Sequence, residues 1–358
     1  MSNNMQKNLM SRRSLFRTGA AAAAAAVAAR LFGVPTPALA QDTGFGPARL
    51  LYLVPQAGGT WYVPAQVGCI DFCKMVGWTA KVATNNNYSV ENHLAAIDAA
   101  IAAKADVIIT ELESVGMVSG FTKAIAAGIT MVIWDQGIKA EADKLDLAII
   151  NQDEFTAGVL QGNTAAKFAQ QLTKKTSGVV VIGNGNPGSV SIDDRQHGTE
   201  QGIAEYNKAN NTTYTTEAFP DSGFSDTAAA IQKYAAQMQD KGDKLVGMVG
   251  LGGTSAIAIA KMLQEKNIAP GTYAVGSPDS FPEQWGLIDS GYIQWGIDQN
   301  FYLMGFLSAA QAWAKLQRGL PIRSVNTGGL LVLKADLPAA KQRSAAWQAV
   351  ATANGLGF

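Results

Sequence analysis

Short apolar runs with strand propensity alternate along almost the whole chain with longer segments of helical periodicity, and this alternation limits the possible folds more than any other feature. The expected strands span residues 49–55, 79–83, 106–110, 130–134, 147–151, 178–182, 214–218, 245–250, 272–275, 293–298 and 329–334. Helical periodicity marks residues 90–103, 114–127, 153–172, 226–239, 254–265 and 301–315. Alternation of this kind is typical of parallel sheets covered by helices on both faces. The sequence therefore predicts an α/β fold.

The number of strand–helix units points to two lobes. A single open, doubly wound sheet does not comfortably hold so many units. Neither a composition break nor a flexible linker marks one cut between two domains. A chain that crosses between two lobes more than once satisfies both observations. Ligands of such sheets bind beyond the carboxyl ends of the strands, so the loops that follow the strands are the places to look for a site.

Residues 1–40 have the features of an export signal. Arg12 and Arg13 precede an alanine-rich apolar stretch, and residues 38–40 supply the small-x-small pattern of a cleavage site. Arg30 interrupts the apolar run well before it could span a bilayer, which argues against a membrane anchor. We expect a cleaved twin-arginine signal peptide, a mature chain that begins near Gln41, and a soluble protein in the periplasm.

Composition excludes several other classes of function. The whole chain has 28 basic and 28 acidic side chains, but five of the basic ones and no acidic one lie in residues 1–40, so the mature chain is net acidic. No basic patch suggests nucleic-acid binding, and no later apolar run is long enough to enter a membrane. Cys69 and Cys73 lie four residues apart on one helix face, at a Cβ separation of about 5–6 Å that is too long for a disulfide. With His93 and His197 as the only histidines, we expect buried thiols and no metal site.

Aromatic, carboxylate, amide and guanidinium side chains gather at the expected strand ends. Ring faces can cover the C–H surface of a sugar, while carboxylates, amides and arginine hold its hydroxyl groups. Each residue alone has an ordinary alternative, because Asp at a helix start is usually an N-cap and a surface Arg is usually solvated. Their joint placement favours a site for a neutral, polyhydroxylated ligand. The candidate residues are Trp61, Tyr62, Thr110, Glu111, Asp135, Gln152, Arg195, Phe224, Asp279 and Gln299.

These segments resemble the motifs of the periplasmic type I sugar-binding proteins, the ribose-binding group that serves ABC transporters. The resemblance covers nearly all of the expected mature chain. Residues 52–68 are similar to the family's first-strand loop with two stacking aromatics, and residues 109–114 to its next strand end. Arg195 and Gly198 match an R-x-x-G motif whose arginine binds sugar. Further matches fall on Asp135, on Gln152 followed by Gly158, on Phe224, on Asp279 and on Gln299 followed by Gly305.

The resemblance implies a two-lobed type I binding-protein fold with a parallel sheet in each lobe and a three-strand hinge near Asn151, Asp298 and Asn326. The first lobe is expected at residues 48–151 and 300–326, and the second at residues 152–299 and 327–358. It implies a monomeric solute-binding protein that captures a small neutral sugar, deoxysugar or polyol between its lobes and delivers it to an ABC permease in the inner membrane. No catalytic residue, cofactor or nucleic-acid partner is expected.

The chain departs from the family pattern in ways that bear on the ligand. Gly252 and Gly253 stand where the family commonly has Asn-Asp, Gly58 replaces a frequent polar contact, and one inserted residue precedes Asp279. Ribose bound in the standard way is therefore not expected. Residues 134–135 and 150–152 also resemble the subgroup that takes rhamnose or the furanosyl signal autoinducer-2.

Two rival functions remain. Residues 183–188 fit G-x-G-x-x-G after a strand, so an exported NAD(P)-dependent oxidoreductase is an alternative, although the motif lies in mid-chain and lacks a well-placed acidic residue beyond it. Hydrolysis is disfavoured, because the chain has no G-x-S-x-G and its two histidines lie on separate helices. A sensor that reports its ligand to a chemoreceptor or kinase is the other alternative.

Overall fold

The computed structural model describes residues 44–55, 62–83 and 89–356. The chain divides into two units, residues 1–46 and 47–358, and the strands and helices of the described residues belong to the second unit. The expected signal peptide at residues 1–40 lies outside the described residues.

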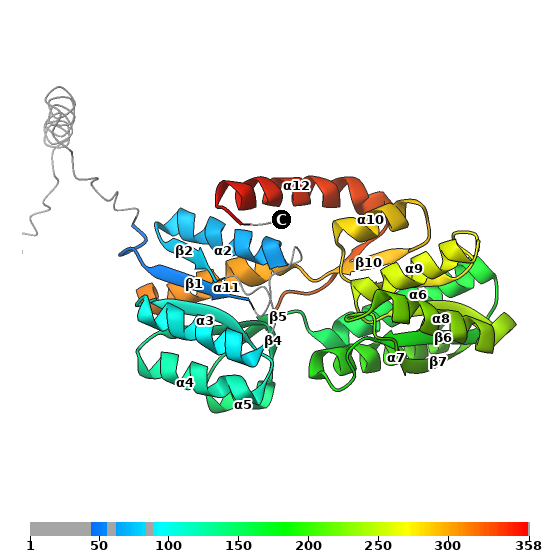
Figure 1. Ribbon diagram of the computed structural model, residues 1–358, viewed down its shortest axis with the longest axis horizontal. Helices are drawn as coiled ribbons and strands as arrows, with labels where there is room; N and C mark the ends of the chain where they lie inside the picture. The colour runs from blue at the N-terminus through cyan, green and yellow to red at the C-terminus, as the bar shows by residue number, and fades with distance from the viewer. Residues whose placement is uncertain (1–43, 56–61, 84–88, 357–358) are drawn as a thin grey trace, which may run out of the picture. The chain divides into compact units, whose positions relative to one another are not determined.

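Two six-stranded sheets form the framework (Figure 1). The first has the order β2 (Thr79–Val82), β1 (Leu50–Val54), β3 (Val107–Leu112), β4 (Thr130–Gly137), β5 (Ile149–Asn151) and β11 (Val325–Asn326). The second has the order β7 (Thr213–Pro220), β6 (Ser177–Asn184), β8 (Leu245–Gly250), β9 (Ala274–Pro278), β10 (Trp295–Asp298) and β12 (Leu330–Val332). Neighbouring strands pair in parallel except β10 and β12, which are antiparallel. The predicted α/β class with two helix-flanked parallel sheets is confirmed.

The two sheets repeat one strand order, so each strand of the first sheet has a counterpart in the second. β1 corresponds to β6, β3 to β8, β4 to β9 and β5 to β10. The chain leaves the first sheet after β5, returns after β10 to form β11, and ends in the second sheet with β12. We call each sheet with the helices packed on it a lobe. The residue boundaries predicted for the lobes stay a prediction.

Helices cover both faces of each sheet (Figure 1). In the first lobe, α2 (Val63–Val76) and α11 (Phe301–Arg318) lie on one face, and α3 (Val90–Ala102), α4 (Val118–Ala126) and α5 (Lys139–Lys144) lie on the other. In the second lobe, α6 (Glu154–Thr173) and α7 (Val190–Asn210) lie on one face, and α8 (Thr227–Lys241), α9 (Gly253–Glu265) and α10 (Pro282–Asp289) lie on the other. Side-chain caps begin several helices; the Asp153 carboxylate, for example, accepts a hydrogen bond from the Thr156 amide at the start of α6.

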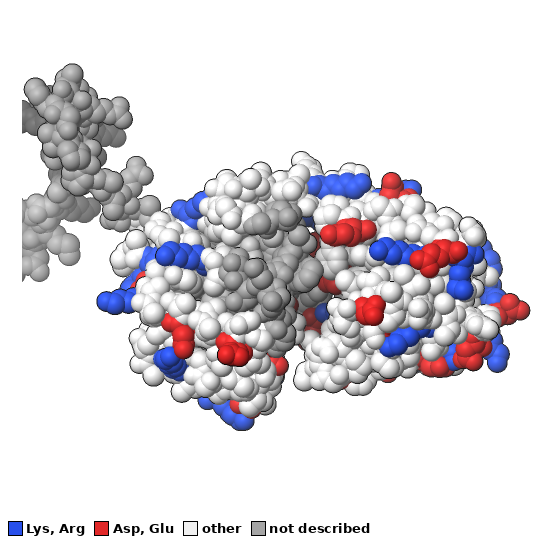
Figure 2. All heavy atoms as spheres, in the orientation of Figure 1, with Lys and Arg blue, Asp and Glu red and all other residues white. Residues whose placement is uncertain are grey.

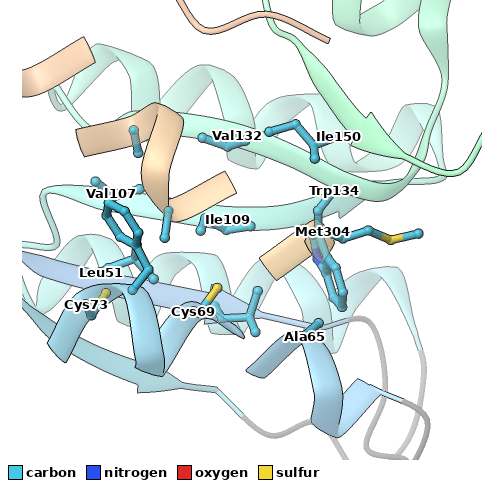
Figure 3. Close-up of a cluster of buried hydrophobic side chains, with 14 of the residues drawn as sticks. Leu51, Ala65, Cys69, Cys73, Val107, Ile109, Val132, Trp134, Ile150 and Met304 are labelled. Carbon is cyan, nitrogen blue, oxygen red and sulfur yellow. The ribbon is translucent and has the colours of Figure 1, made fainter. Parts of the chain in front are cut away.

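The core of the first lobe shows why its strands are apolar along their whole length. β3 is buried at every residue, because helices cover both of its faces. Figure 3 shows Leu51, Ile109 and Trp134 of the sheet facing Cys69 of α2 and Met304 of α11. Both cysteines are buried free thiols, and burial raises the pKa of the Cys73 thiol to about 12.

Glycines bring one pair of helices into backbone contact in each lobe. A Cβ at Gly162 of α6 would overlap the Thr199 carbonyl oxygen of α7, and a Cβ at Gly305 of α11 would overlap the Ala65 carbonyl oxygen of α2. Each pair contains one helix that arrives from the other lobe, because α6 follows β5 and α11 follows β10. The other glycines of these contacts are Gly68, Gly158, Gly198 and Gly202.

The last helix, α12 (Leu337–Ala353), contacts both lobes. It packs on α2 at one end and on α10 at the other (Figure 1). Trp347 stacks on the Tyr302 ring of α11 at 5.8 Å between centroids, while Leu337 and Ala340 join the core of the second lobe. Residues 327–358, which were expected to belong to the second lobe, therefore contact both lobes.

Acidic and basic side chains are interspersed on the face seen in Figure 2, and the described residues form no extended patch of one sign there. Among the described residues, no helix combines the length and the apolar character needed to cross a bilayer.

Candidate functional site

A cleft of about 690 Å³ lies between the carboxyl ends of the two sheets and is lined from both lobes. A second cleft of about 760 Å³ continues from it and shares Asp135, Glu154 and Ser189. Spaces of several hundred cubic ångströms are typical of small-molecule sites. The first cleft is lined by these expected residues: Tyr62, Asp135, Arg195, Phe224, Asp279 and Gln299.

Two aspartates occupy equivalent positions in the two lobes. Asp135 is the last buried residue of β4, and Asp279 follows its counterpart β9. Both have a positive φ, +56° for Asp135 and +74° for Asp279, a conformation that costs free energy for a residue other than glycine. At Asp135 the pairing of β3 with β4 changes register between Thr110 and Leu112, so the chain bulges there. Each bend turns a carboxylate into the cleft.

Asp135 is the most strongly perturbed acid of the cleft. Its side chain is 5% exposed, and burial raises its pKa to about 7, with repulsion from Glu154 and Asp279 acting in the same direction. Attraction to Arg195 and a hydrogen bond from Tyr62 oppose the rise. The carboxylate therefore lacks enough partners within the protein to offset its desolvation.

Arg195 is fixed by a buried ion pair. Its Nε and Nη2 atoms lie 2.8 and 2.7 Å from Glu154 Oε2, and Nη1 donates to the Leu251 carbonyl oxygen at 2.6 Å. Burial lowers the pKa of Arg195, but the charges of Glu154, Asp279 and Asp135 more than offset this, and the pKa is raised overall. Burial raises the pKa of Glu154, partly offset by Arg195. Guanidinium has five N–H groups, so donors remain for a ligand.

The second aspartate is held by hydrogen bonds. Gly253 donates its backbone N–H to Asp279 Oδ2 at 2.8 Å, and Gln299 Nε2 donates to Oδ1 at 2.5 Å. Gln299 is 7% exposed and follows the end of β10. These bonds orient the carboxylate from one side and leave its remaining lone pairs for a ligand.

Aromatic rings form the rest of the lining. In the first lobe, Tyr62 lies edge-to-face with Trp134 at 5.4 Å and with Phe301 at 5.7 Å between centroids. In the second lobe, Phe224 is 42% exposed although it is a large apolar side chain, and Phe281 lies nearby in the same lining. Rings at the cleft surface suit the C–H faces of a cyclic ligand.

Other candidates lie elsewhere. Thr110 is buried, accepts from His93 Nε2 at 2.5 Å and donates to the Val54 carbonyl oxygen at 2.8 Å. Glu111 and Gln152 are buried as well, and neither is among the described residues that line the two clefts. Glu113, which lies just beyond the end of β3, is part of the lining. Trp61 lies outside the described residues.

The expected hinge residues lie where the chain passes between the lobes. Asn151 pairs with Asn326, and the Asn326 Oδ1 atom accepts from the Asp153 amide at 3.1 Å. Asn300 donates its side-chain amide to the Thr327 carbonyl oxygen at 2.9 Å. Asp298 accepts from the Asn300 amide at 2.9 Å, and burial raises its pKa. The third crossing is thus hydrogen-bonded to each of the other two.

The lining residues that were not among the candidates include Glu154, Phe281 and Phe301. An internal repeat could have found two of them. The run 151–154, Asn-Gln-Asp-Glu, and the run 298–301, Asp-Gln-Asn-Phe, follow equivalent strands, and a glycine that contacts the partner helix comes four residues after each. Glu154 and Phe301 thus stand at the same position of the two repeats.

The glycine-rich run at residues 183–188 is not arranged to bind a pyrophosphate. The Gly188 amide faces the Asp193 carboxylate, with N–O distances of 3.4 and 3.2 Å, so a carboxylate already lies where an anion would bind at the start of α7. Asn184 donates to Asp193 and Gln196 from the same loop. Within the described parts of the chain, no group of His, Cys, Asp or Glu side chains could hold a metal ion.

Comparison with known proteins places these features in a family. Residues 50–320 match the family described as "Periplasmic binding protein domain". A xylose/arabinose-binding protein of Sulfolobus acidocaldarius is 24% identical over 276 residues, which is 72% of this chain and 64% of that protein. The chain thus spans less than two thirds of this curated relative.

Solved structures share the fold. A solute-binding protein of Burkholderia graminis in complex with D-arabinose is 21% identical with a TM-score of 0.69, over 81% of this chain and 96% of that one. One of Agrobacterium vitis with α-D-tagatopyranose is 23% identical with a TM-score of 0.69, over 82% and 98%. A carbohydrate transporter of Acidothermus cellulolyticus with myo-inositol is 19% identical with a TM-score of 0.66, over 84% and 99%. The family match covers most of the chain, and the chain therefore belongs to the periplasmic binding proteins.

Proposed function

We propose that this chain is the solute-binding protein of an ABC transporter. It captures a small neutral sugar, deoxysugar or polyol between its lobes and delivers it to a permease in the inner membrane. The observation that carries the proposal is one cleft, lined from both lobes, in which aromatic rings accompany buried carboxylates and an arginine. Similar structures that hold D-arabinose, α-D-tagatopyranose or myo-inositol support it.

Charge in the cleft favours a neutral ligand. Asp135, Glu154, Asp279 and Glu113 face it, against the single guanidinium of Arg195, which is already paired with Glu154. A phosphate or carboxylate ligand meets net repulsion there. Hydroxyl groups, in contrast, donate to carboxylates and accept from the remaining guanidinium N–H groups.

Binding couples to closure of the lobes. A sugar ring first lies against Tyr62 of the first lobe and donates to Asp135, and then draws Arg195 and Phe224 of the second lobe toward it. Rotation is taken up near Asn151, Asp298 and Asn326. Micromolar affinity requires about −8 kcal/mol, which is within reach of a ligand of about twelve heavy atoms. The cycle involves no covalent step, so we expect no turnover.

We also infer export by the twin-arginine route and a periplasmic location for the mature chain. The arginine pair, the apolar stretch and the cleavage pattern of residues 1–40 support this inference. Replacing Arg12 and Arg13 together with Lys should retain the protein in the cytoplasm, as measured by cell fractionation. Undiminished export of the double variant would refute the route.

A thermal-shift screen followed by titration calorimetry tests the function. The mature chain is screened against pentoses, hexoses, deoxysugars, polyols, autoinducer-2, NAD and NADP, because a ligand that binds only the folded state raises the melting temperature. A rise with one carbohydrate class, followed by saturable heat of binding, supports the proposal. A rise with NAD or NADP alone overturns it in favour of an oxidoreductase.

Variants then test the site. Asp135→Ala and Arg195→Ala should abolish binding of that ligand while circular dichroism stays that of the folded protein. Asp98→Ala is the matched control. Asp98 lies on α3, away from the cleft, and forms a surface ion pair with Lys123. Wild-type affinity in both cleft variants refutes the site assignment.

A further inference from the structure

Two phenylalanine rings of the second lobe pack against glycines that follow the carboxyl ends of β6 and β8. The Phe224 ring lies between Gly185 and Gly252: a Cβ on Gly185 would lie 2.9 Å from its Cγ atom, and a Cβ on Gly252 would overlap its edge. A Cβ on Gly253 would overlap the Phe281 ring in the same way. Glycine at these positions is therefore what makes room for the two rings.

The equivalent place in the first lobe is polar. β3 corresponds to β8, and its carboxyl end presents Glu113 to the cleft. After β8 the chain presents glycines and then Thr254, whose buried Oγ1 atom has no hydrogen-bond partner among the described residues. Phe224, Thr254 and Phe281 all line the cleft, and we call them the phenylalanine wall. It presents two apolar rings to the cleft, and its only hydroxyl group, that of Thr254, is buried.

A ligand group that lies against the phenylalanine wall loses its contacts with water and gains contacts with the carbon atoms of the rings. A ligand hydroxyl pressed against a ring loses hydrogen bonds to water without replacement, and this exchange is unfavourable. A methyl group or a carbon without a hydroxyl gains from the same burial. The Thr254 hydroxyl is buried, so no polar side-chain atom of the wall faces the cleft to replace those hydrogen bonds.

We propose that the phenylalanine wall selects a deoxysugar, with its methyl group or deoxygenated carbon against Phe224 and Phe281. This rests on the proposed function and names its substrate class. Asp135, Asp279 and Arg195 hold the hydroxylated part of the ligand, while the wall rejects a sugar that carries a further hydroxyl on the carbon it covers.

Matched sugar pairs test the selection by titration calorimetry on the mature wild-type chain. The pairs are L-rhamnose with L-mannose, L-fucose with L-galactose, D-fucose with D-galactose, and 2-deoxy-D-ribose with D-ribose. In at least one pair the deoxy member should bind about tenfold tighter or more, since one small group in an apolar pocket commonly changes affinity by that factor. Tighter binding of the hydroxylated member in every pair that binds overturns the inference and leaves the proposed function standing. Absence of binding in all pairs, with binding of another sugar or a polyol from the screen, overturns the inference alone, and absence of binding to every sugar and polyol of the screen refutes the proposed function as well.

Variants connect the preference to the wall. Phe224→Asn should reduce the preference within the selected pair at least about fivefold, whereas Phe224→Leu, which keeps an apolar surface, should largely retain it. Ile125→Asn is the matched control, because Ile125 is an apolar residue of α4 with 39% exposure that lines neither cleft. If neither Phe224→Asn nor Ile125→Asn changes the affinity ratio within the selected pair, the phenylalanine wall does not cause the preference.

Discussion

Replacing Asp135 with Asn should make the ligand-free protein more stable, and the gain should grow with pH. The carboxyl group is buried, and its pKa is raised from 3.8 to about 7. Between those two pH values the folded state keeps a proton that the unfolded state releases, so stability falls as pH rises and the loss is complete above pH 7. Asparagine is neutral in both states and removes this dependence.

The magnitude follows from the size of the shift. About three pKa units correspond to at most about 4 kcal/mol at pH 8 and to about 2 kcal/mol at pH 5. Any cost of fitting an amide beside Tyr62 is the same at both pH values. The pH-dependent difference of about 2 kcal/mol is therefore the quantity to measure.

Urea denaturation of Asp135→Asn and of the wild-type protein at pH 5 and pH 8, without ligand, measures it. Asp279→Asn is the control, because Asp279 accepts two hydrogen bonds from Gly253 and Gln299 and its replacement should destabilise the protein at both pH values. A gain in Asp135→Asn that does not increase from pH 5 to pH 8 would show that burial of this carboxylate is not costly. The same variant should lose ligand binding, because the carboxylate that destabilises the folded protein is needed to bind the ligand.

Three further changes test the framework around the cleft. Gly162→Ala should lower the free energy of unfolding by about 2 kcal/mol or more through overlap with α7, whereas Gly286→Ala in open space should raise it by about 0.5–1 kcal/mol; equal effects in urea denaturation contradict the backbone contact. Burial lowers the pKa of His93 to about 4, so stability should fall by at most about 3 kcal/mol as pH drops from 6.5 to 4, and His93→Gln should flatten that slope in the same assay. Glu154→Gln should cost about 3 kcal/mol because buried Arg195 loses its charged partner; wild-type stability would mean that the pair is not needed.

The strands could be predicted because burial on both faces leaves a simple signature. Every expected strand is present, and β4 extends beyond its expected end at Trp134 because the chain bulges through Asp135 before pairing again at Gly137. α7 was not predicted in full. Its sequence is rich in polar residues, and the face it buries against α6 depends on Gly198 and Gly202 rather than on large apolar side chains.

The site was predictable where chemistry and strand ends coincide. Asp135 meets that condition, whereas Arg195 lies in α7 and was expected from the resemblance to an R-x-x-G motif; both line the cleft. Glu111 does not line the cleft, because it lies within β3, which is buried at every residue, whereas Glu113 comes just after the strand and is part of the lining. Glu154 could not be predicted, because the sequence marks only its neighbour Asp153, as a helix cap. The tertiary fold alone brings Arg195 to Glu154.

The helix exchange between lobes has a consequence for biosynthesis. The sheet face of the first lobe that carries α2 is completed only by α11, which begins at Phe301, so no contiguous fragment ending near Asn151 contains a whole first lobe. Such distant contacts close long loops and slow folding. The second lobe has both of its paired helices, α6 and α7, within one short stretch of chain. Its sheet, however, is completed only by β12 and its core only by Leu337 of α12, so both lobes must wait until almost the entire polypeptide has been made.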